Sequence, residues 1–144
     1  MYIRMNKESF WAKEKKYVYR LLNYDGRIPL YKLSRDHCSE VSRLLADRLL
    51  RRFPKSKLYI AKGELKARAH DVIFFEPNGG VFYIIDPTIW QIFKMKKSIL
   101  VSDAKNLNDA LKILSRMYSG KWKISEKVTG YSSGTLNGFY ESLT

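Results

Sequence analysis

Apolar positions recur three or four residues apart in two early parts of the chain, and this spacing predicts helices. The first part covers residues 6–22, with Asn6 as its candidate N-cap. The second lies within residues 34–54, where Ser34 or Asp36 can cap the free amides of the first turn. The chain is therefore expected to begin with two amphipathic helices.

The pattern then changes from helical spacing to short segments rich in β-branched and aromatic residues, which are typical of strands. These segments are KLYIA, AHDVIFFE, GVFYIID and SILV. Helical spacing returns after Ser102 and Asp103, either of which can cap a third helix that ends before Gly120. This order of elements predicts an α+β fold in which helices pack on a small antiparallel sheet.

The chain has 144 residues, 45% of them hydrophobic, and this suffices for the core of a single domain over residues 1–144. Residues 125–144 carry Gly, Ser and Thr with few aliphatic side chains, so we expect them to be irregular or loosely attached. No segment approaches the roughly 20 uninterrupted apolar residues of a membrane span. The N-terminus also lacks the apolar stretch of a secretory signal. The cytoplasm is therefore the expected location.

The net charge of +13 favours attraction to nucleic acid, an anionic membrane surface or an acidic protein partner. The densest basic groups along the chain are KEKK and RLLRRFPKSK. The candidate phosphate contacts are Arg48, Arg51, Arg52, Lys55 and Lys57. Such residues more often form the solvated side of an amphipathic helix. Nucleic-acid binding therefore stays an alternative function.

Two of the strand-like segments flank Pro77-Asn78-Gly79, a residue order typical of a three-residue hairpin loop. A loop of this length would pair His70 directly with Asp86. Direct partners share a face of the sheet and are close enough for a carboxylate to hold an imidazole nitrogen. Both faces of the hairpin are apolar, so we expect it to be covered on both sides, where a buried Asp needs a partner.

Cys38 is the only cysteine, which excludes an internal disulfide and a metal site built from several thiolates, and we expect no cofactor. It lies at the predicted start of the second helix, where free N–H groups and the helix dipole favour a thiolate. With His70 as base and Asp86 as orienting acid, it has the chemistry of a nucleophilic triad. The neighbouring His37 is the competing imidazole.

The order and spacing of these residues resemble the transglutaminase-like and papain-like cysteine enzyme superfamily. Its bacterial transglutaminase-like members commonly carry His-Ala-Trp, a strand, a Gly-rich turn, a second strand and Asp-Pro-Thr. The sequence AHDVIFFEPNGGVFYIIDPT follows this pattern in outline. The resemblance covers residues 34–90 and implies a papain-like core, with Cys38 as nucleophile, His70 as base and Asp86 as the orienting acid.

One departure from the family pattern is Asp71, which stands where the Trp after the His is usual. Trp90 and Gln91 follow the Asp-Pro-Thr and are the candidate substrate-binding residues. The Cys38 N–H would be one oxyanion donor, and Gln91 or the loop of residues 23–26 would supply a second.

The activity that the resemblance implies is attack on an amide carbonyl through a thioester. The short chain is most similar to small papain-fold toxin or effector domains that deamidate protein glutamine side chains. A cysteine protease and a transglutaminase of the same fold are the alternatives, and so is a catalytically idle adaptor. A protein substrate is implied, with a cognate inhibitory or immunity protein as a further partner. Delivery into a target cell is then the alternative to a cytoplasmic location.

Overall fold

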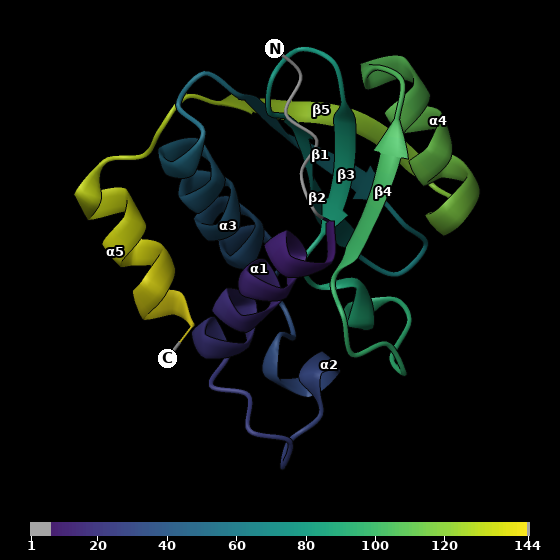
Figure 1. Cartoon of the computed structure of the whole chain (residues 1–144). Coiled ribbons are helices and arrows are strands. Elements are labelled where there is room, and N and C mark those ends of the chain that lie inside the picture. Colours follow the sequence, from purple (N-terminus) through teal and green to yellow (C-terminus); the bar gives the residue numbers. More distant parts are fainter. Residues whose placement is uncertain (1–6, 144) are drawn as a thin grey trace.

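The core of the molecule is a five-stranded antiparallel sheet with strand order β4-β3-β2-β1-β5. A computed structural model describes residues 7–143 (Figure 1). The strands are β1 (Lys57–Glu64), β2 (Ala69–Glu76), β3 (Phe82–Asp86), β4 (Leu100–Ala104) and β5 (Lys121–Val128). The predicted α+β class with an antiparallel sheet is confirmed. The last predicted strand, SILV, begins two residues earlier than β4 does.

Helices cover both faces of this sheet (Figure 1). They are α1 (Lys7–Leu21), α2 (Leu30–Leu33), α3 (Cys38–Arg52), α4 (Leu107–Tyr118) and α5 (Ser133–Ser142), with a 3-10 turn, η1, at Ile89–Gln91. One face packs on α1 and α3, and the opposite face packs on α4. None of the helices in residues 7–143 is long and apolar enough to cross a membrane.

The two faces of the β2–β3 hairpin belong to different apolar clusters because side chains alternate along a strand. Ile73 and Ile85 join the cluster with α1 and α3, whereas Phe74 and Ile84 join the cluster with α4. All four side chains are fully buried. The predicted covered, central position of this hairpin is confirmed.

The hairpin register differs from the prediction. Phe75 pairs with Tyr83 and Ile73 with Ile85, so the loop between the strands runs over residues 77–81 rather than 77–79. Gly79 still has a positive φ of 75°, as a left-handed loop residue requires. Continued outward, this register places His70 opposite Thr88 instead of Asp86. Since the shift is two residues, His70 and Asp86 nevertheless keep the same face.

The prediction that residues 125–144 are irregular was wrong for most of this segment. Residues 121–128 form β5, which pairs with β1 along the edge of the sheet. Residues 133–142 form α5, which contacts α3, and its Leu136 side chain is buried. Lysines alternate with partly buried residues along β5, so one side of the strand packs while the other stays in solvent.

The helix caps also differ from those predicted. His37 rather than Ser34 or Asp36 is the N-cap position of α3, and its side chain makes no capping hydrogen bond. Asn106 caps α4 by accepting a hydrogen bond from the Asp109 N–H at 2.9 Å, because the predicted caps Ser102 and Asp103 belong to β4. The predicted cap of the first helix, Asn6, lies outside the described residues.

Candidate active site

His70 and Asp86 form a buried pair at one end of the β2–β3 hairpin. His70 Nε2 lies 2.8 Å from Asp86 Oδ2, and neither side chain is exposed. His70 is the second residue of β2, and Asp86 is the last residue of β3. Diagonal neighbours on one face of an antiparallel pair are within reach of long side chains. The expected contact therefore forms, but diagonally rather than across a direct pair.

Asp86 accepts hydrogen bonds from two further groups. The Tyr118 hydroxyl, at the end of α4, donates to Oδ2 at 2.5 Å, and the Thr88 N–H donates to Oδ1 at 3.1 Å. Burial, together with the charge of Asp86 and its hydrogen bond, raises the pKa of Tyr118 well above the usual value for a phenol. Tyr118 therefore remains a donor across the ordinary pH range and helps to hold the carboxylate in place.

Aromatic rings surround the imidazole. The ring centroid of His70 lies 5.8 Å from that of Tyr118 and 6.4 Å from that of Trp122 in β5, the latter in an edge-to-face arrangement. Trp122 occupies the space beside Gly63 of β1, where an added Cβ would lie 2.4 Å from the indole. Gly63 therefore lets the indole approach the sheet closely and pack beside His70.

Cys38 is the first residue of α3, and its side chain is partly exposed. Burial opposes a charge on His70, but the charge and hydrogen bond of Asp86, with a contribution from the Cys38 thiol, raise the pKa of His70 to about 10. Nδ1 of His70 is buried and has no hydrogen-bond partner of ordinary geometry among the described residues. Because Nε2 is engaged by Asp86, Nδ1 is the nitrogen left for the thiol.

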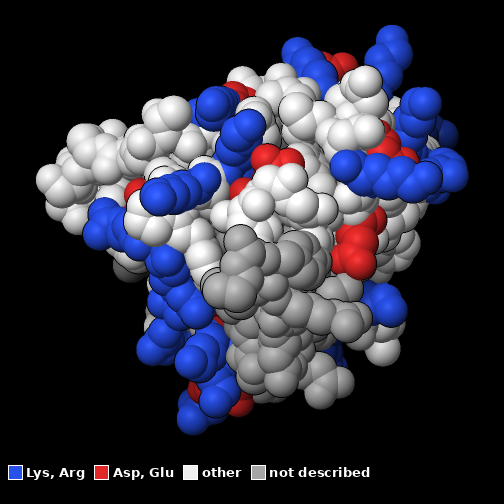
Figure 2. Space-filling view, turned by 45° about the horizontal axis from the view of Figure 1, so that its top comes forward, with Lys and Arg blue, Asp and Glu red and all other residues white. Residues whose placement is uncertain are grey.

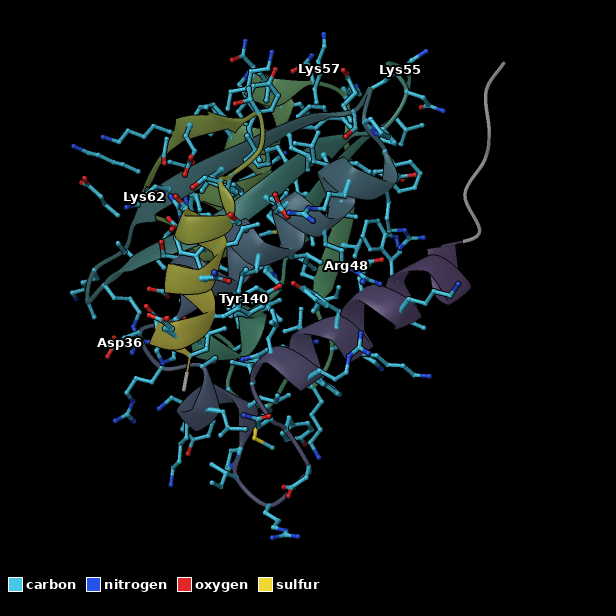
Figure 3. The ribbon with its side chains drawn as sticks, turned by 90° about the vertical axis from the view of Figure 1, so that its left-hand side faces the viewer. Asp36, Arg48, Lys55, Lys57, Lys62 and Tyr140 are labelled. Atoms are coloured by element: carbon cyan, nitrogen blue, oxygen red, sulfur yellow. The ribbon has the colours of Figure 1, made fainter. Side chains whose placement is uncertain are left out.

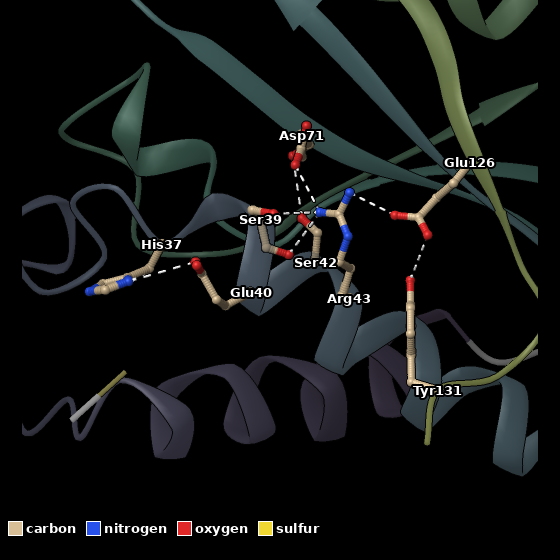
Figure 4. Close-up of polar contacts among 8 residues, drawn as sticks. All are labelled: His37, Ser39, Glu40, Ser42, Arg43, Asp71, Glu126 and Tyr131. Carbon is tan, nitrogen blue, oxygen red and sulfur yellow. Dashed lines mark hydrogen bonds and ion pairs between the residues drawn. The ribbon is translucent and has the colours of Figure 1, made fainter. Parts of the chain in front are cut away.

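The competing imidazole, His37, is directed elsewhere. Its Nδ1 lies 3.7 Å from Glu40 Oε2 within the first turn of α3 (Figure 4). The side chain is 28% exposed, whereas that of His70 is completely buried. His70 is therefore the imidazole that has both a carboxylate partner and an influence from the Cys38 thiol.

The structure does not support substrate contacts by Trp90 and Gln91. Trp90 is fully buried, and its indole N–H donates to Ser34 Oγ at 2.7 Å. Gln91 is 6% exposed, and its side-chain amide donates to the Ser34 carbonyl. These hydrogen bonds tie η1 to the segment between α2 and α3, so both residues fix the backbone before Cys38.

Tyr118 is the residue at this site that sequence reasoning missed. It belongs to the predicted third helix, whose apolar spacing indicates only core positions, and most of its ring does pack in the core. The hydroxyl reaches Asp86 because α4 ends over the last residue of β3. No local feature of the sequence predicts that contact, since 32 residues separate the two positions.

Comparison of the chain with models of protein families, with curated proteins and with solved structures finds no match.

Proposed function

We propose that this protein is a cysteine-dependent acyl-transfer enzyme in which Cys38 attacks an amide carbonyl and His70 handles the proton. One observation carries the proposal. The fully buried His70 imidazole is hydrogen-bonded to Asp86 through Nε2, and its Nδ1 has no hydrogen-bond partner of ordinary geometry within residues 7–143. The Cys38 thiol at the start of α3 contributes to the raised pKa of this ring. A nucleophile, a base and an orienting carboxylate in that order are the components of a triad.

Glutamine side chains are the proposed substrate class. The Cys38 sulfur would form a bond to the amide carbon, and ammonia would leave with a proton from His70. Water would then attack the thioester and give a proton to the same imidazole, and the bond between the carbon and the sulfur would break to release the Cys38 thiolate. Overall, the amide and one water become a carboxylate and an ammonium ion. Asp86 would orient the ring and stabilise its charged form.

The electrostatics of the site support this chemistry. With a pKa of about 10, His70 carries a proton at neutral pH, and an imidazolium favours a neighbouring thiolate. The His37 side chain does not cap α3, and the first N–H groups of a helix have no intrahelical acceptors. Free N–H groups at the start of α3 could therefore stabilise the oxyanion that forms on the attacked carbonyl.

The papain-like core and the choice of glutamine deamidation come from the sequence resemblance, which favours small effector domains. Proteolysis and amide crosslinking share the same thioester and differ in the bond cleaved or in the acceptor that resolves it. Intact-mass measurement of candidate protein substrates after incubation separates these reactions: amide-to-acid conversion, fragments, or joining with loss of ammonia.

Alkylation of the full chain by iodoacetamide tests the mechanism without a known substrate. Cys38 should react at pH 6 to 7, where an ordinary thiol with a pKa of about 8.5 reacts slowly. His70→Ala should slow the reaction, and His37→Ala, which removes the adjacent imidazole, should not. Equal rates for the wild type and His70→Ala would refute the proposed pairing of thiol and imidazole.

Binding of a nucleic acid is a second candidate function, favoured by one surface feature. A hollow of about 390 Å³ is lined by basic residues of α1 and α3 and by one tyrosine, namely Lys13, Lys16, Tyr19, Arg20 and Arg48. No carboxylate is among these lining residues. Figure 2 shows lysine and arginine side chains spread widely over one face of the molecule, with fewer acidic ones between them.

The basic residues named from the sequence form no single patch. Arg48 pairs with the buried Glu14 of α1, and Arg51 pairs with Asp47. Figure 3 shows Lys55 and Lys57 at one end of the molecule, away from Arg48 beside α1. The exposed residues of α1 therefore replace them as the stronger candidates for phosphate contacts.

Salt dependence of binding to a single-stranded oligonucleotide tests this candidate. Replacing Lys13, Lys16 and Arg20 by Gln should reduce the slope of log K against log salt by about 2, because each lost phosphate contact contributes about 0.7. Lys121, Lys123 and Lys127, exposed along β5, provide a control with the same change in charge. An equal effect of both triple substitutions would indicate only general attraction by the net charge.

A further inference from the structure

Arg43 connects the first turn of α3 with two strands of the sheet (Figure 4). Its Nη1 donates to the Ser39 carbonyl at 3.1 Å, to Ser39 Oγ at 2.6 Å and to Asp71 Oδ2 at 3.0 Å. Its Nη2 lies 2.7 Å from Glu126 Oε1 in β5. One guanidinium therefore joins α3, β2 and β5 near the N-terminal end of α3, where the helix begins with Cys38.

Asp71 lies next to His70 in β2 but on the opposite face of the sheet. The side chain of His70 faces Tyr118 of α4, whereas that of Asp71 faces Arg43 of α3. The Ser42 hydroxyl donates to the Asp71 carbonyl at 3.3 Å, which adds a second link between α3 and this strand residue. Asp71, which stands where the superfamily that the sequence resembles usually has a Trp, thus anchors the helix in this protein.

Burial and charge restrict the position of the Arg43 guanidinium and of its carboxylate partners. The Arg43 side chain is 13% exposed and that of Asp71 is 2% exposed. Buried ions are stable only when their partners satisfy them with good geometry. Glu126 provides the second carboxylate, and it accepts a hydrogen bond from the Tyr131 hydroxyl at 3.3 Å. Small displacements of α3 along β2 would therefore break several buried contacts at once.

We infer that Arg43 is a positioning residue that sets the separation between the Cys38 thiol and the His70 imidazole. It holds Ser39, which follows Cys38, and Asp71, which follows His70, on the same guanidinium nitrogen. Arg43 thereby holds the residue that directly follows each of the two reacting residues. The inference rests on the proposed function, because it assigns Arg43 a role in that same site.

Arg43→Lys is the informative substitution. Lysine keeps the positive charge, but its single ammonium cannot reproduce the planar fork that reaches Ser39, Asp71 and Glu126 together. The groups that face His70, which are Asp86 and Tyr118, remain unchanged. The titratable groups that flank Cys38, which are His37 and Glu40, remain unchanged too. A change in thiol reactivity would then report a change in position.

Arg48→Lys is the matched control, since it alters another ion pair of the same helix. Arg48 Nε lies 2.9 Å from Oε2 of the completely buried Glu14. We expect Arg43→Lys to lower the rate of Cys38 alkylation at pH 7 by about tenfold and to move its pH profile towards that of an ordinary thiol. Arg48→Lys should reduce the unfolding midpoint and leave the profile in place.

The outcomes separate this inference from the proposed function. If the wild-type thiol has the pH profile of an unperturbed cysteine, the proposed function fails. If the wild type is reactive and Arg43→Lys has the same profile, the positioning role is wrong and the function stands. If Arg43→Lys does not fold, Ser39→Ala removes only the 2.6 Å contact to Oγ. It should slow alkylation severalfold, and an unchanged rate would overturn the inference.

Discussion

His70 and Asp86 meet at 2.8 Å although the register of β2 and β3 does not pair them directly. Asp86 ends β3 diagonally across from His70, on the face that α4 covers. The pair is buried, and Tyr118 and the Thr88 N–H complete the hydrogen bonds of the carboxylate. The position of the imidazole is thus determined by three elements that lie far apart along the chain.

Asp86→Asn should reduce the rate of Cys38 alkylation at pH 7, and any turnover, by about 100-fold or more, because the ring loses its orienting charge. The same change should lower the pKa of His70 from about 10, since Asp86 is the main group that raises it. Titration of the imidazole by NMR measures this directly. Unchanged reactivity in a folded variant would contradict the orienting role.

Tyr118→Phe should lower the free energy of unfolding by about 1 to 3 kcal/mol, since it removes a donor from a buried carboxylate without changing the apolar ring. Urea unfolding measures the effect. Tyr140→Phe is the matched control: its hydroxyl lies 3.2 Å from that of Tyr17, and the side chain is 44% exposed. The control should change stability by less than about 0.5 kcal/mol. Equal costs for both variants would argue against the Asp86 contact.

Stability should depend on pH through His70. Its pKa in the folded protein, about 10, lies above the ordinary value of 6.5, so the protonated ring stabilises the fold fully below pH 6.5. That contribution is lost as the pH rises towards 10. Between these limits, the wild type should lose more unfolding free energy than His70→Gln, by an amount on the order of a few kcal/mol. Urea midpoints at a series of pH values test this, and parallel curves would contradict it.

Gly63→Ala should destabilise the protein by about 1 to 3 kcal/mol, because the new Cβ would lie 2.4 Å from the Trp122 indole and push it away from His70. Gly138→Ala is the control, since Gly138 lies within α5 and an added Cβ there meets nothing within 4 Å. That change should be neutral or stabilising. Thermal unfolding of the two variants gives the comparison, and a neutral Gly63→Ala would show that the indole is not held tightly.

Local patterns were sufficient for most elements of the fold. Helical spacing identified α1, α3 and α4, and β-branched or aromatic runs identified β1 to β3, because these patterns follow directly from the geometry of each element. The last part of the chain carried the weaker signal. The alternation in KWKISEKV is strand-like, but its lysines and the few aliphatic residues beyond it concealed β5 and α5, which gain their stability from β1 and α3.

The sequence likewise predicted some features of the candidate site and not others. Chemistry alone singled out Cys38, His70 and Asp86, because few residue types can act as nucleophile, base and orienting acid. Turn chemistry also gave the correct shared face for His70 and Asp86, although not the correct loop length, since an error of two residues preserves the alternation of a strand. The sequence could not show that Trp90 and Gln91 form hydrogen bonds to Ser34.

The sequence by itself determined which residues could form helices and strands, which side of each would be apolar, and which groups were available for thiol chemistry. Tertiary structure alone decided that Tyr118 reaches Asp86, that Trp122 packs beside His70 over Gly63, and that Arg43 joins Ser39 to Asp71. Local patterns depend on residues a few positions apart, whereas these contacts join separate elements. Their distances depend on how the sheet and helices pack, which no short stretch of sequence encodes.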